Sequence, residues 1–448
     1  MTTRNALGLA AILAVAAGLR ASDLGRASLW YDEVVTMTLA RADGPTALIE
    51  SLGRIDATRA PLHPLLLQQW LRVFGASDAA GRSFSVVCGV LTVALIYRLG
   101  LRAYGDVPTA LWAAALAAVS PMLVVYSREA RMYAWLVLVT CLAWDALLNL
   151  RDGPTSRRLA WYAAWLAALG YSHPLGLLMI AALCAASLVV RPAAGRSRGR
   201  WLAPYAAAGL ALAPWIPRYL DHDPESTVGR LPIQFLLGTP IGFLGGNFLA
   251  LALFAGVIAF GLSRSRDRRT ACACLVLWLA VPPVLLYAYS RLSHPIFGPA
   301  RYTLFVAPAY LLLLARGLTR MPLLPRIGVA SLAFGLAASA LPGTVYGPDL
   351  KADWRAVSSF LNAADPSERD AVVVLTADPA HNVETVTARY YLGPMRPVTD
   401  APPRSGRAWY AIGVRSGRPV ADLPLVAHRG MVRDFPGLRL VGPVGDAD

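Results

Sequence analysis

The chain has 448 residues, of which 56% are hydrophobic and only 15% are charged. Soluble domains carry about 25% charged residues, so this composition excludes an ordinary soluble protein and favours one that crosses a membrane repeatedly. A formal charge of +15 at pH 7 would also suit a nucleic-acid-binding protein. The basic residues, however, lie in short clusters between apolar segments, as in the cytoplasmic loops of membrane proteins. We therefore expect the lipid bilayer, and no nucleic acid, as a partner.

Residues 6–21 form the first apolar segment, which Arg4 precedes. Many apolar segments follow it, and no small-residue cleavage motif leads into soluble sequence, so we predict a transmembrane helix rather than a signal peptide. Residues 34–52 carry interspersed charges, and residues 61–74 are too few to span a bilayer. We predict that both form amphipathic helices along the membrane surface. A short tilted span is the alternative for the second.

Ten further apolar stretches resemble membrane spans and, with the first helix, predict eleven transmembrane helices. They are residues 83–99, 109–126, 133–150, 159–171, 175–190, 202–216, 235–262, 271–290, 302–315 and 327–341. If the chain starts in the cytoplasm, alternation places five Arg-rich loops there, among them "SRSRDRRT" and "NLRDGPTSRR". Their charge agrees with the positive-inside rule, which supports this orientation.

The tail beyond residue 341 is far less apolar than the rest. Its stretches "DAVVVLT", "RAWYAIGV" and "LRLVGPV" predict strands. The stretch "ADWRAVSSFLNAA" predicts a helix with Asp353 as its N-cap. We therefore predict a membrane module of residues 1–341 and a small extracytoplasmic α/β domain of residues 342–448. We expect this domain to support the module or to select an acceptor. It holds the single lysine of the chain, Lys351.

The loops on the outer side collect the reactive side chains. The acid pair Asp32 and Glu33 stands in "SLWYDEVVT", directly after the first helix. The alternative to a catalytic role is that these acids cap the helix that follows. The stretch "SREARMY" holds Arg128 and Arg131, which would share one face of a helix. Two guanidinium groups on one face suit a phosphate, although arginines at a membrane boundary also serve as interface anchors.

Other outer residues also have a structural alternative. Arg301 and Tyr302 in "PARY" are also ordinary residues of a membrane interface. His173 and His294 each precede a proline at a span boundary, so a turn is the first interpretation and contact with a substrate the second.

The order of these motifs resembles that of the GT-C integral-membrane glycosyltransferases. The resemblance is to the family 39-like branch of protein O-mannosyltransferases and lipid A aminoarabinose transferases. It rests on the acid pair, a Pro-Leu-rich helix that ends "WLRVFG", and the stretches "GRSFSVVCGVLTVALIYRLG", "SPMLVVYSREARMYAW" and "RYTLFVAPAYLLLLARGL". It implies an all-α polytopic membrane protein that moves one sugar, such as mannose or arabinose, from a polyprenyl-phosphate lipid to a glycan, lipid or protein acceptor.

The resemblance also assigns roles and a location. Asp32 would lie beside the anomeric carbon with Glu33 as its partner, and Arg131 and Tyr133 match family positions at the donor phosphate. Here "TRAPLHP" departs from the family pattern, which leaves open whether Arg59 or His63 meets that phosphate. The family works without a cofactor and generally without metal, on the periplasmic or outer side of the bacterial cytoplasmic (inner) membrane. We expect the same here.

Elementary chemistry supports the same division of roles. A hydroxyl that attacks an anomeric carbon needs a proton acceptor. A leaving phosphate needs positive charge rather than a general acid, so one carboxylate and a few arginines suffice for an inverting transfer. A glycosidase needs two carboxyls across the sugar, about 5–9 Å apart, which adjacent residues do not supply. A metal-dependent transferase with a diphosphate carrier is the alternative within the enzyme class.

Two other classes of protein remain alternatives. A multi-pass transporter would place ionisable groups inside its spans, where Asp145 is the main example in this sequence. A non-catalytic membrane assembly protein would tolerate loss of Asp32.

Overall fold

The computed structural model describes residues 2–56, 58–190, 199–220, 232–293, 300–345, 351–365, 370–375, 383–393, 396–399, 407–413 and 431–444. Its contacts divide the chain into two compact units. The helical unit comprises Met1–Ser22 and Leu39–Val345, and the second unit comprises Asp23–Thr38 and Tyr346–Asp448. The acid pair therefore belongs to the same compact unit as the tail.

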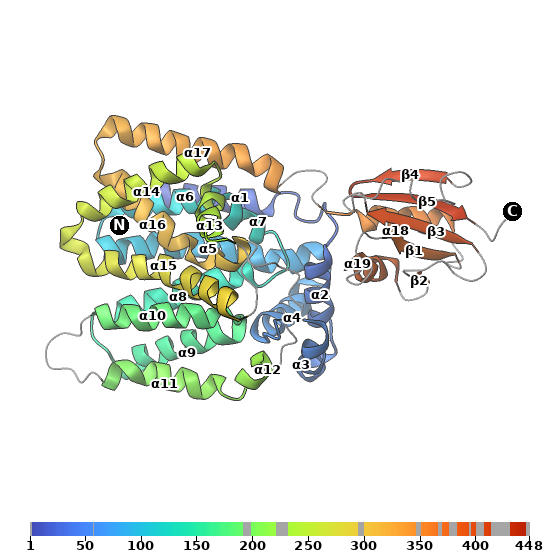
Figure 1. Ribbon diagram of the computed structural model, residues 1–448, viewed down its shortest axis with the longest axis horizontal. Helices are drawn as coiled ribbons and strands as arrows, with labels where there is room; N and C mark the ends of the chain where they lie inside the picture. Colours follow the sequence, from blue (N-terminus) through green and yellow to red (C-terminus); the bar gives the residue numbers. More distant parts are fainter. Residues whose placement is uncertain are drawn as a thin grey trace. The chain divides into compact units, whose positions relative to one another are not determined.

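The helices of the helical unit run largely alongside one another (Figure 1). They are α1 (Thr3–Ala21), α3 (Gly44–Ile55), α4 (Leu62–Phe74), α5 (Asp78–Tyr104), α6 (Val107–Val119), α7 (Pro121–Tyr126), α8 (Tyr133–Leu150), α9 (Ser156–Ser172), α10 (Gly176–Val189), α11 (Gly199–Leu212), α12 (Ile216–Leu220), α13 (Phe235–Leu244), α14 (Phe248–Ser263), α15 (Arg269–Leu292), α16 (Ala307–Arg320) and α17 (Leu323–Val345), with 3₁₀ turns η1 (Arg266–Arg268) and η2 (Ala300–Val306). Helix α2 (Tyr31–Ala40) crosses the boundary between the units.

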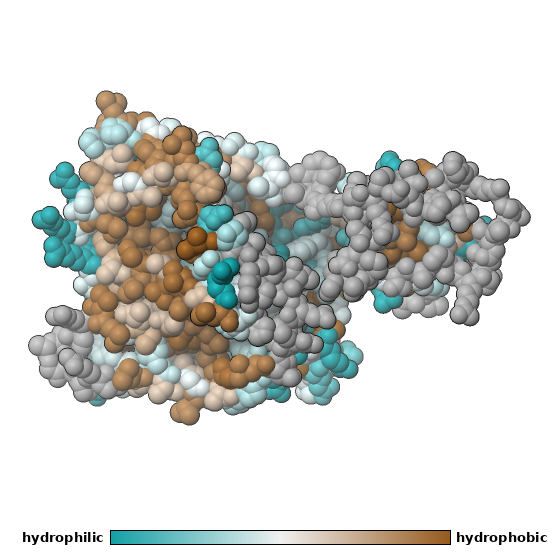
Figure 2. All heavy atoms as spheres, in the orientation of Figure 1, coloured by the Kyte–Doolittle hydropathy of each residue, from teal (hydrophilic) through white to brown (hydrophobic). Residues whose placement is uncertain are grey.

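Every predicted span coincides with helix, but the predicted number of eleven spans is not confirmed. Among the described residues, six helices are long and apolar enough to cross a membrane, or seven if α13 and α14 form one bent span. Helices α6 and α10 are apolar but shorter. On the face shown in Figure 2, apolar side chains cover the middle of the helical unit and hydrophilic ones gather at its left edge. These features are those of a membrane protein.

Four predicted helices are interrupted: the one over residues 202–216 breaks between α11 and α12, and the breaks in the other three are as follows. The helix predicted over residues 34–52 is two helices, α2 and α3, separated at Arg41–Asp43. Residues 109–126 break at Ser120, which precedes Pro121 and whose hydroxyl donates to the Phe243 carbonyl at 2.6 Å. Residues 235–262 bend by 87° between α13 and α14. Gly245 and Gly246 stand at that bend with φ of 78° and 102°, which glycine adopts without strain.

Two ionisable residues between the helices, Asp145 and Arg20, have their polar atoms satisfied by neighbouring helices. Asp145 on α8 accepts from Arg98 at 2.9 Å and from Arg102 at 2.7 Å, both on α5. Arg20 on α1 is fully buried and donates to the Ala118 carbonyl at 2.8 Å and to Ser127 Oγ at 3.3 Å. These contacts satisfy polar groups that an apolar interior would otherwise penalise.

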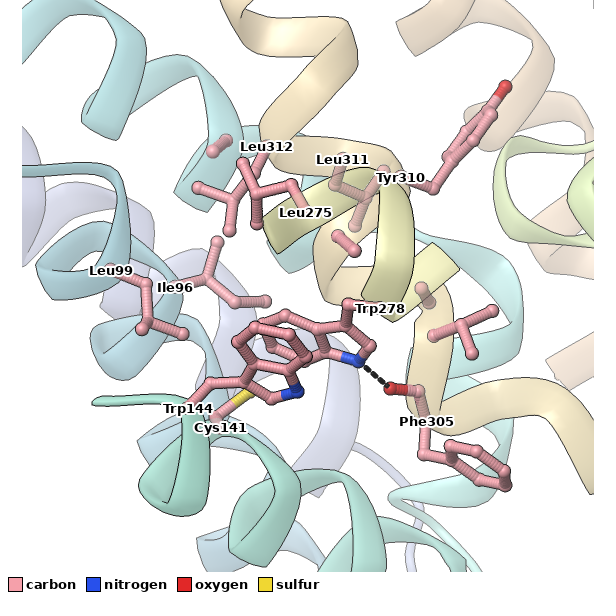
Figure 3. Packing of buried hydrophobic residues seen from close by; sticks show 14 of the residues in the cluster. Ile96, Leu99, Cys141, Trp144, Leu275, Trp278, Phe305, Tyr310, Leu311 and Leu312 are labelled. Atoms are coloured by element: carbon pink, nitrogen blue, oxygen red, sulfur yellow. Dashed lines mark hydrogen bonds between the residues drawn. The ribbon is translucent and has the colours of Figure 1, made fainter. Parts of the chain in front are cut away.

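Two stacked tryptophans join the centre of the helical unit. Trp144 on α8 and Trp278 on α15 lie with ring centroids 4.8 Å apart and planes 5° apart (Figure 3). The Trp278 indole N–H donates to the Phe305 carbonyl at 2.8 Å. Phe305 belongs to η2, the short turn that also carries Arg301 and Tyr302. The core therefore fixes the segment from which these two side chains project.

The second unit contains a five-stranded sheet of order β2-β1-β3-β5-β4. Strand β1 (Ala371–Leu375) pairs in parallel with β2 (Val398–Thr399) and β3 (Ala408–Gly413). Strand β5 (Leu438–Val444) pairs antiparallel with β3 and with β4 (Met431–Phe435). Helices α18 (Trp354–Ala364) and α19 (Val383–Leu392) complete the unit. The predicted small α/β fold is present, and its three predicted strands are β1, β3 and β5.

The predicted cap of α18 is also present. The Asp353 side chain accepts from the Ala356 N–H at 3.1 Å. Trp354, Val357 and Leu361 lie on the buried face of this helix, and Trp354 Nε1 donates to Glu384 of α19 at 2.8 Å. The sequence did not reveal α19, β2 or β4.

Replacing Trp278 by Phe should lower the thermal unfolding temperature of the detergent-solubilised protein by several degrees. The Phe305 carbonyl loses a buried donor, a loss of about 1–3 kcal/mol, and the stack loses area. Trp161→Phe is the control, because Trp161 on α9 is 55% exposed. Equal unfolding temperatures for the two variants would contradict this role of Trp278.

Candidate functional site

The acid pair opens α2, and its two carboxylates lie in different environments. The helix begins at Tyr31, one residue before Asp32, so both acids lie in the first turn. Asp32 is half-buried, whereas Glu33 is fully buried. Glu33 Oε2 accepts from the Trp30 backbone N–H at 3.4 Å and lies 2.7 Å from Lys351 Nζ. The capping contact expected of the acid pair is therefore made by Glu33, as in a capping box.

The sequence predicted that Arg128 and Arg131 share one face of a helix, and this prediction is wrong. Helix α7 ends at Tyr126 and α8 begins at Tyr133, so both arginines lie in the turn between them. The Arg128 guanidinium donates to the carbonyls of Leu19, Arg20 and Ser22, at 3.3, 3.0 and 2.6 Å. Those carbonyls end α1, where a cation complements the helix dipole.

Arg131 is 5% exposed and lies in a cluster that several segments build. Its backbone carbonyl accepts from Ser85 of α5 at 3.3 Å. The Tyr133 ring packs at 6.4 Å from His173, and the Arg301 guanidinium lies 5.9 Å from the centre of the Tyr133 ring. The same guanidinium lies 5.5 Å from the Tyr302 ring. We call Arg131, Tyr133, His173, Arg301 and Tyr302 the arginine cluster.

The pKa of His173 shows the effect of the positive charges in this cluster. Its pKa is lowered from 6.5 to about 3, first by burial and then by the positive charges of Arg131 and Arg301. Both guanidinium groups therefore act on the same imidazole. His173 also ends α9, and its Nδ1 accepts from the Leu175 N–H at 3.0 Å. This is the turn role that the following proline indicated, and it leaves the proton on Nε2 of the neutral ring.

His63 lies beside the arginine cluster, at the start of α4. It is buried, its ring meets Phe84 edge-on at 5.6 Å, and its Nε2 makes no hydrogen bond. Burial, and then the charge of Arg131, lower its pKa from 6.5 to about 3. The His63 ring is therefore neutral near pH 7, and its Nε2 is a buried polar atom within the influence of the Arg131 charge.

Arg59 lies against a different helix. Its guanidinium donates to the Arg218 carbonyl of α12 at 3.2 Å, and its own carbonyl accepts from Trp215 Nε1 at 2.9 Å. Its backbone φ of 49° fits this turn. Of the two residues left open by the sequence, the structure places His63 near Arg131. His294 lies outside the described residues.

Two further polar contacts involve residues that the sequence did not single out as functional. Trp135 of α8 donates from Nε1 to Ser172 Oγ at 2.8 Å, which fixes the end of α9 next to His173. Lys351, the partner of Glu33, was missed as a site residue; its only sequence signal is that it is the single lysine. Within the described part of the chain, no three His, Cys, Asp or Glu side chains gather as metal ligands would.

Comparison with known proteins gives the architecture a precedent. A family model, described as dolichyl-phosphate-mannose-protein mannosyltransferase, matches residues 58–220. The apo crystal structure of ArnT from Cupriavidus metallidurans superimposes with a TM-score of 0.63 at 15% identity, over 97% of each chain. Its undecaprenyl phosphate complex gives a TM-score of 0.60 at 16% identity, over 97% of this chain and 98% of that one. The chain has the GT-C fold.

The GT-C resemblance predicted from the motifs is thereby confirmed at the level of the fold. A further structure has a similar fold. The oligosaccharyltransferase of Archaeoglobus fulgidus matches with a TM-score of 0.56 at 14% identity. That match covers 89% of this chain but only 64% of the archaeal one. No curated protein matches the sequence.

Replacing His63 by Phe should make the stability of the protein less dependent on pH. The unfolded chain binds a proton at this histidine near pH 6.5, but the folded protein does so only near pH 3. The folded state therefore loses stability as the pH falls from about 6.5 towards 3, by up to about 1.4 kcal/mol per pH unit.

The measurement is the unfolding temperature in detergent at about pH 7 and about pH 5. The variant should lose less stability than the parent between the two values. An identical decrease in both proteins would show that folding does not lower the pKa of His63.

Proposed function

We propose that the protein is a glycosyltransferase of the bacterial cytoplasmic membrane. It takes a single sugar from a polyprenyl-phosphate lipid and transfers it, with inversion, to a glycan, lipid or protein acceptor on the outer face. The observation that carries the proposal is the arginine cluster, where two guanidinium groups meet aromatic rings and a neutral histidine. ArnT, which shares the fold, binds undecaprenyl phosphate, and the family model names a lipid-phosphate sugar.

The proposed step is one displacement at the anomeric carbon. The acceptor hydroxyl oxygen forms a bond to that carbon while the bond between the carbon and the phosphate oxygen breaks. The electron pair of the broken bond leaves with the polyprenyl phosphate. Asp32 takes the hydroxyl proton. Arg131 and Arg301 stabilise the charge on the departing phosphate, and His63, Tyr133 and Tyr302 line the donor.

The neutral histidines fit this assignment. Because their pKa values are about 3, His63 and His173 are not imidazolium ions near neutral pH and do not serve as general acids. A phosphate leaving group is a weak base and needs none. The two rings are left to orient the donor by hydrogen bonds.

One observation disfavours the transporter alternative. Asp145, the main ionisable residue within a predicted span, forms ion pairs with Arg98 and Arg102. It thereby joins two helices, as a structural residue does. EDTA treatment separates the proposed enzyme from a metal-dependent oligosaccharide transferase, since the proposed chemistry proceeds without a divalent ion.

Asp32→Asn should reduce sugar transfer a hundredfold or more while donor binding stays within about threefold of the parent. The substitution keeps the shape and removes the proton acceptor, whose loss commonly reduces rates by 10²–10⁴. Purified protein and a radiolabelled polyprenyl-phosphate sugar allow binding and transfer to be measured separately. Normal turnover would show that Asp32 only opens the helix.

Arg131→Ala should weaken donor binding and turnover together. The phosphate is charged in the ground state and gains charge as it leaves, so the guanidinium acts in both states. Arg131→Lys should restore only part of each, because an ammonium group does not supply the same fork of donors. Arg72→Ala is the matched control, since Arg72 lies exposed on α4 and donates to Gln69 at 3.1 Å. Equal effects at both positions would refute the role of Arg131.

A further inference from the structure

The segment Asp23–Thr38 is anchored to the tail by hydrogen bonds at several points. The Leu29 N–H donates to the Tyr391 hydroxyl at 2.6 Å. Ser28 Oγ donates to Asp353 at 3.0 Å, and the Arg355 guanidinium donates to the Gly25 carbonyl at 2.5 Å. All of these partners belong to the second unit. The loop that precedes the acid pair is therefore built on residues more than 300 positions away.

Lys351 extends this anchoring to the acid pair itself. Its Nζ lies 2.7 Å from Glu33 Oε2, and the Glu33 side chain is completely buried, whereas that of Lys351 is 18% exposed. The ammonium group also lies 6.0 Å from the centre of the Trp30 ring. A buried carboxylate is strongly disfavoured without compensating charge, so the Lys351 ammonium group helps to hold Glu33 in its buried position.

Fixing Glu33 fixes the orientation of its neighbour. Successive residues of an α-helix are about 100° apart around the axis, so a buried Glu33 sets the direction in which Asp32 points. The Asp32 carbonyl accepts from Thr36 Oγ1 at 3.0 Å within the same turn. Asp32 remains half-buried beside its fully buried neighbour.

We infer that Lys351 is a positioning residue for the transfer reaction. By pairing with Glu33, it holds the first turn of α2 so that Asp32 can take the proton of the acceptor. The inference rests on the proposed function, in which Asp32 is the base. It assigns Glu33 to the support of Asp32 rather than to proton transfer, and it gives the tail a role in the transfer step besides acceptor selection.

Lys351→Met in the full-length protein should lower kcat tenfold to a hundredfold, the order expected when a reacting group is displaced by about 1 Å. The KM for the polyprenyl-phosphate sugar should stay within about threefold, because the residues proposed to bind the phosphate are unchanged. Lys351→Arg should recover part of the rate. The double variant Glu33→Gln/Lys351→Met should be no slower than the worse single variant, because both changes remove one interaction.

Arg439→Met is the matched control. Arg439 is another cation of the same unit, and it pairs with Asp434 on an exposed hairpin. This variant should keep the parental kcat. A Lys351→Met protein with parental kcat would overturn the inference. A double variant in which the rate losses of Lys351→Met and Glu33→Gln multiply would overturn it as well, because the two residues would then act independently. If Asp32→Asn is inactive in the same assay, such a result rejects the positioning role alone. If Asp32→Asn is active, the proposed base itself is wrong.

A second measurement tests the pair without any activity. Because Lys351 is the only lysine, an amine-reactive reagent labels one side chain besides the N-terminus, and mass spectrometry of the peptide separates the two. The folded parent should react slowly at Lys351, and Glu33→Gln should raise that rate at least several-fold. Equal rates in the two folded proteins would show that the pair does not form in solution. This test stands even if Lys351→Met fails to fold.

Discussion

Burial of guanidinium charge in an apolar helical unit is the constraint on which the structure depends. Arg20 and Arg316 are almost completely buried, and each donates hydrogen bonds to several acceptors. Arg20 donates to carbonyls of α1 and α6, and Arg316 donates to Ser265 Oγ at 2.8 Å and to Asp106 at 3.2 Å. Each such arginine ties several helices together. Arg131 is buried in the same way, and the guanidinium group of Arg301 lies in the same cluster. Two guanidinium groups close together favour the binding of an anion.

This concentration of positive charge also divides the chemistry among the residues. Burial keeps the rings of His63 and His173 neutral, and the charge of Arg131 at both of them and of Arg301 at His173 acts in the same direction. In the proposed reaction the proton acceptor is a carboxylate, Asp32. The two adjacent acids then differ in role: Glu33, paired with Lys351, supports the helix turn, and Asp32 is the residue that it supports.

The sequence predicted those features that local chemistry determines. Helix α8 was expected over the residues it occupies, because an apolar run is bounded by Arg131 and Arg151. The breaks at Ser120 and at Gly245 were not seen, since apolar residues continue on both sides of each. The turn that carries Arg128 depends on carbonyls at the end of α1, and the role of Lys351 depends on a partner 318 positions away. Tertiary partners of this kind leave no local pattern.

The central claim is that Arg131 and Arg301 hold the phosphate of a polyprenyl-phosphate donor. Its most direct test is an experimental structure of the protein with a bound polyprenyl phosphate. We expect phosphate oxygens to lie about 2.7–2.9 Å from guanidinium nitrogens of both arginines, as in charge-assisted hydrogen bonds. A phosphate bound elsewhere, with both guanidinium groups more than about 6 Å from it, would contradict the account.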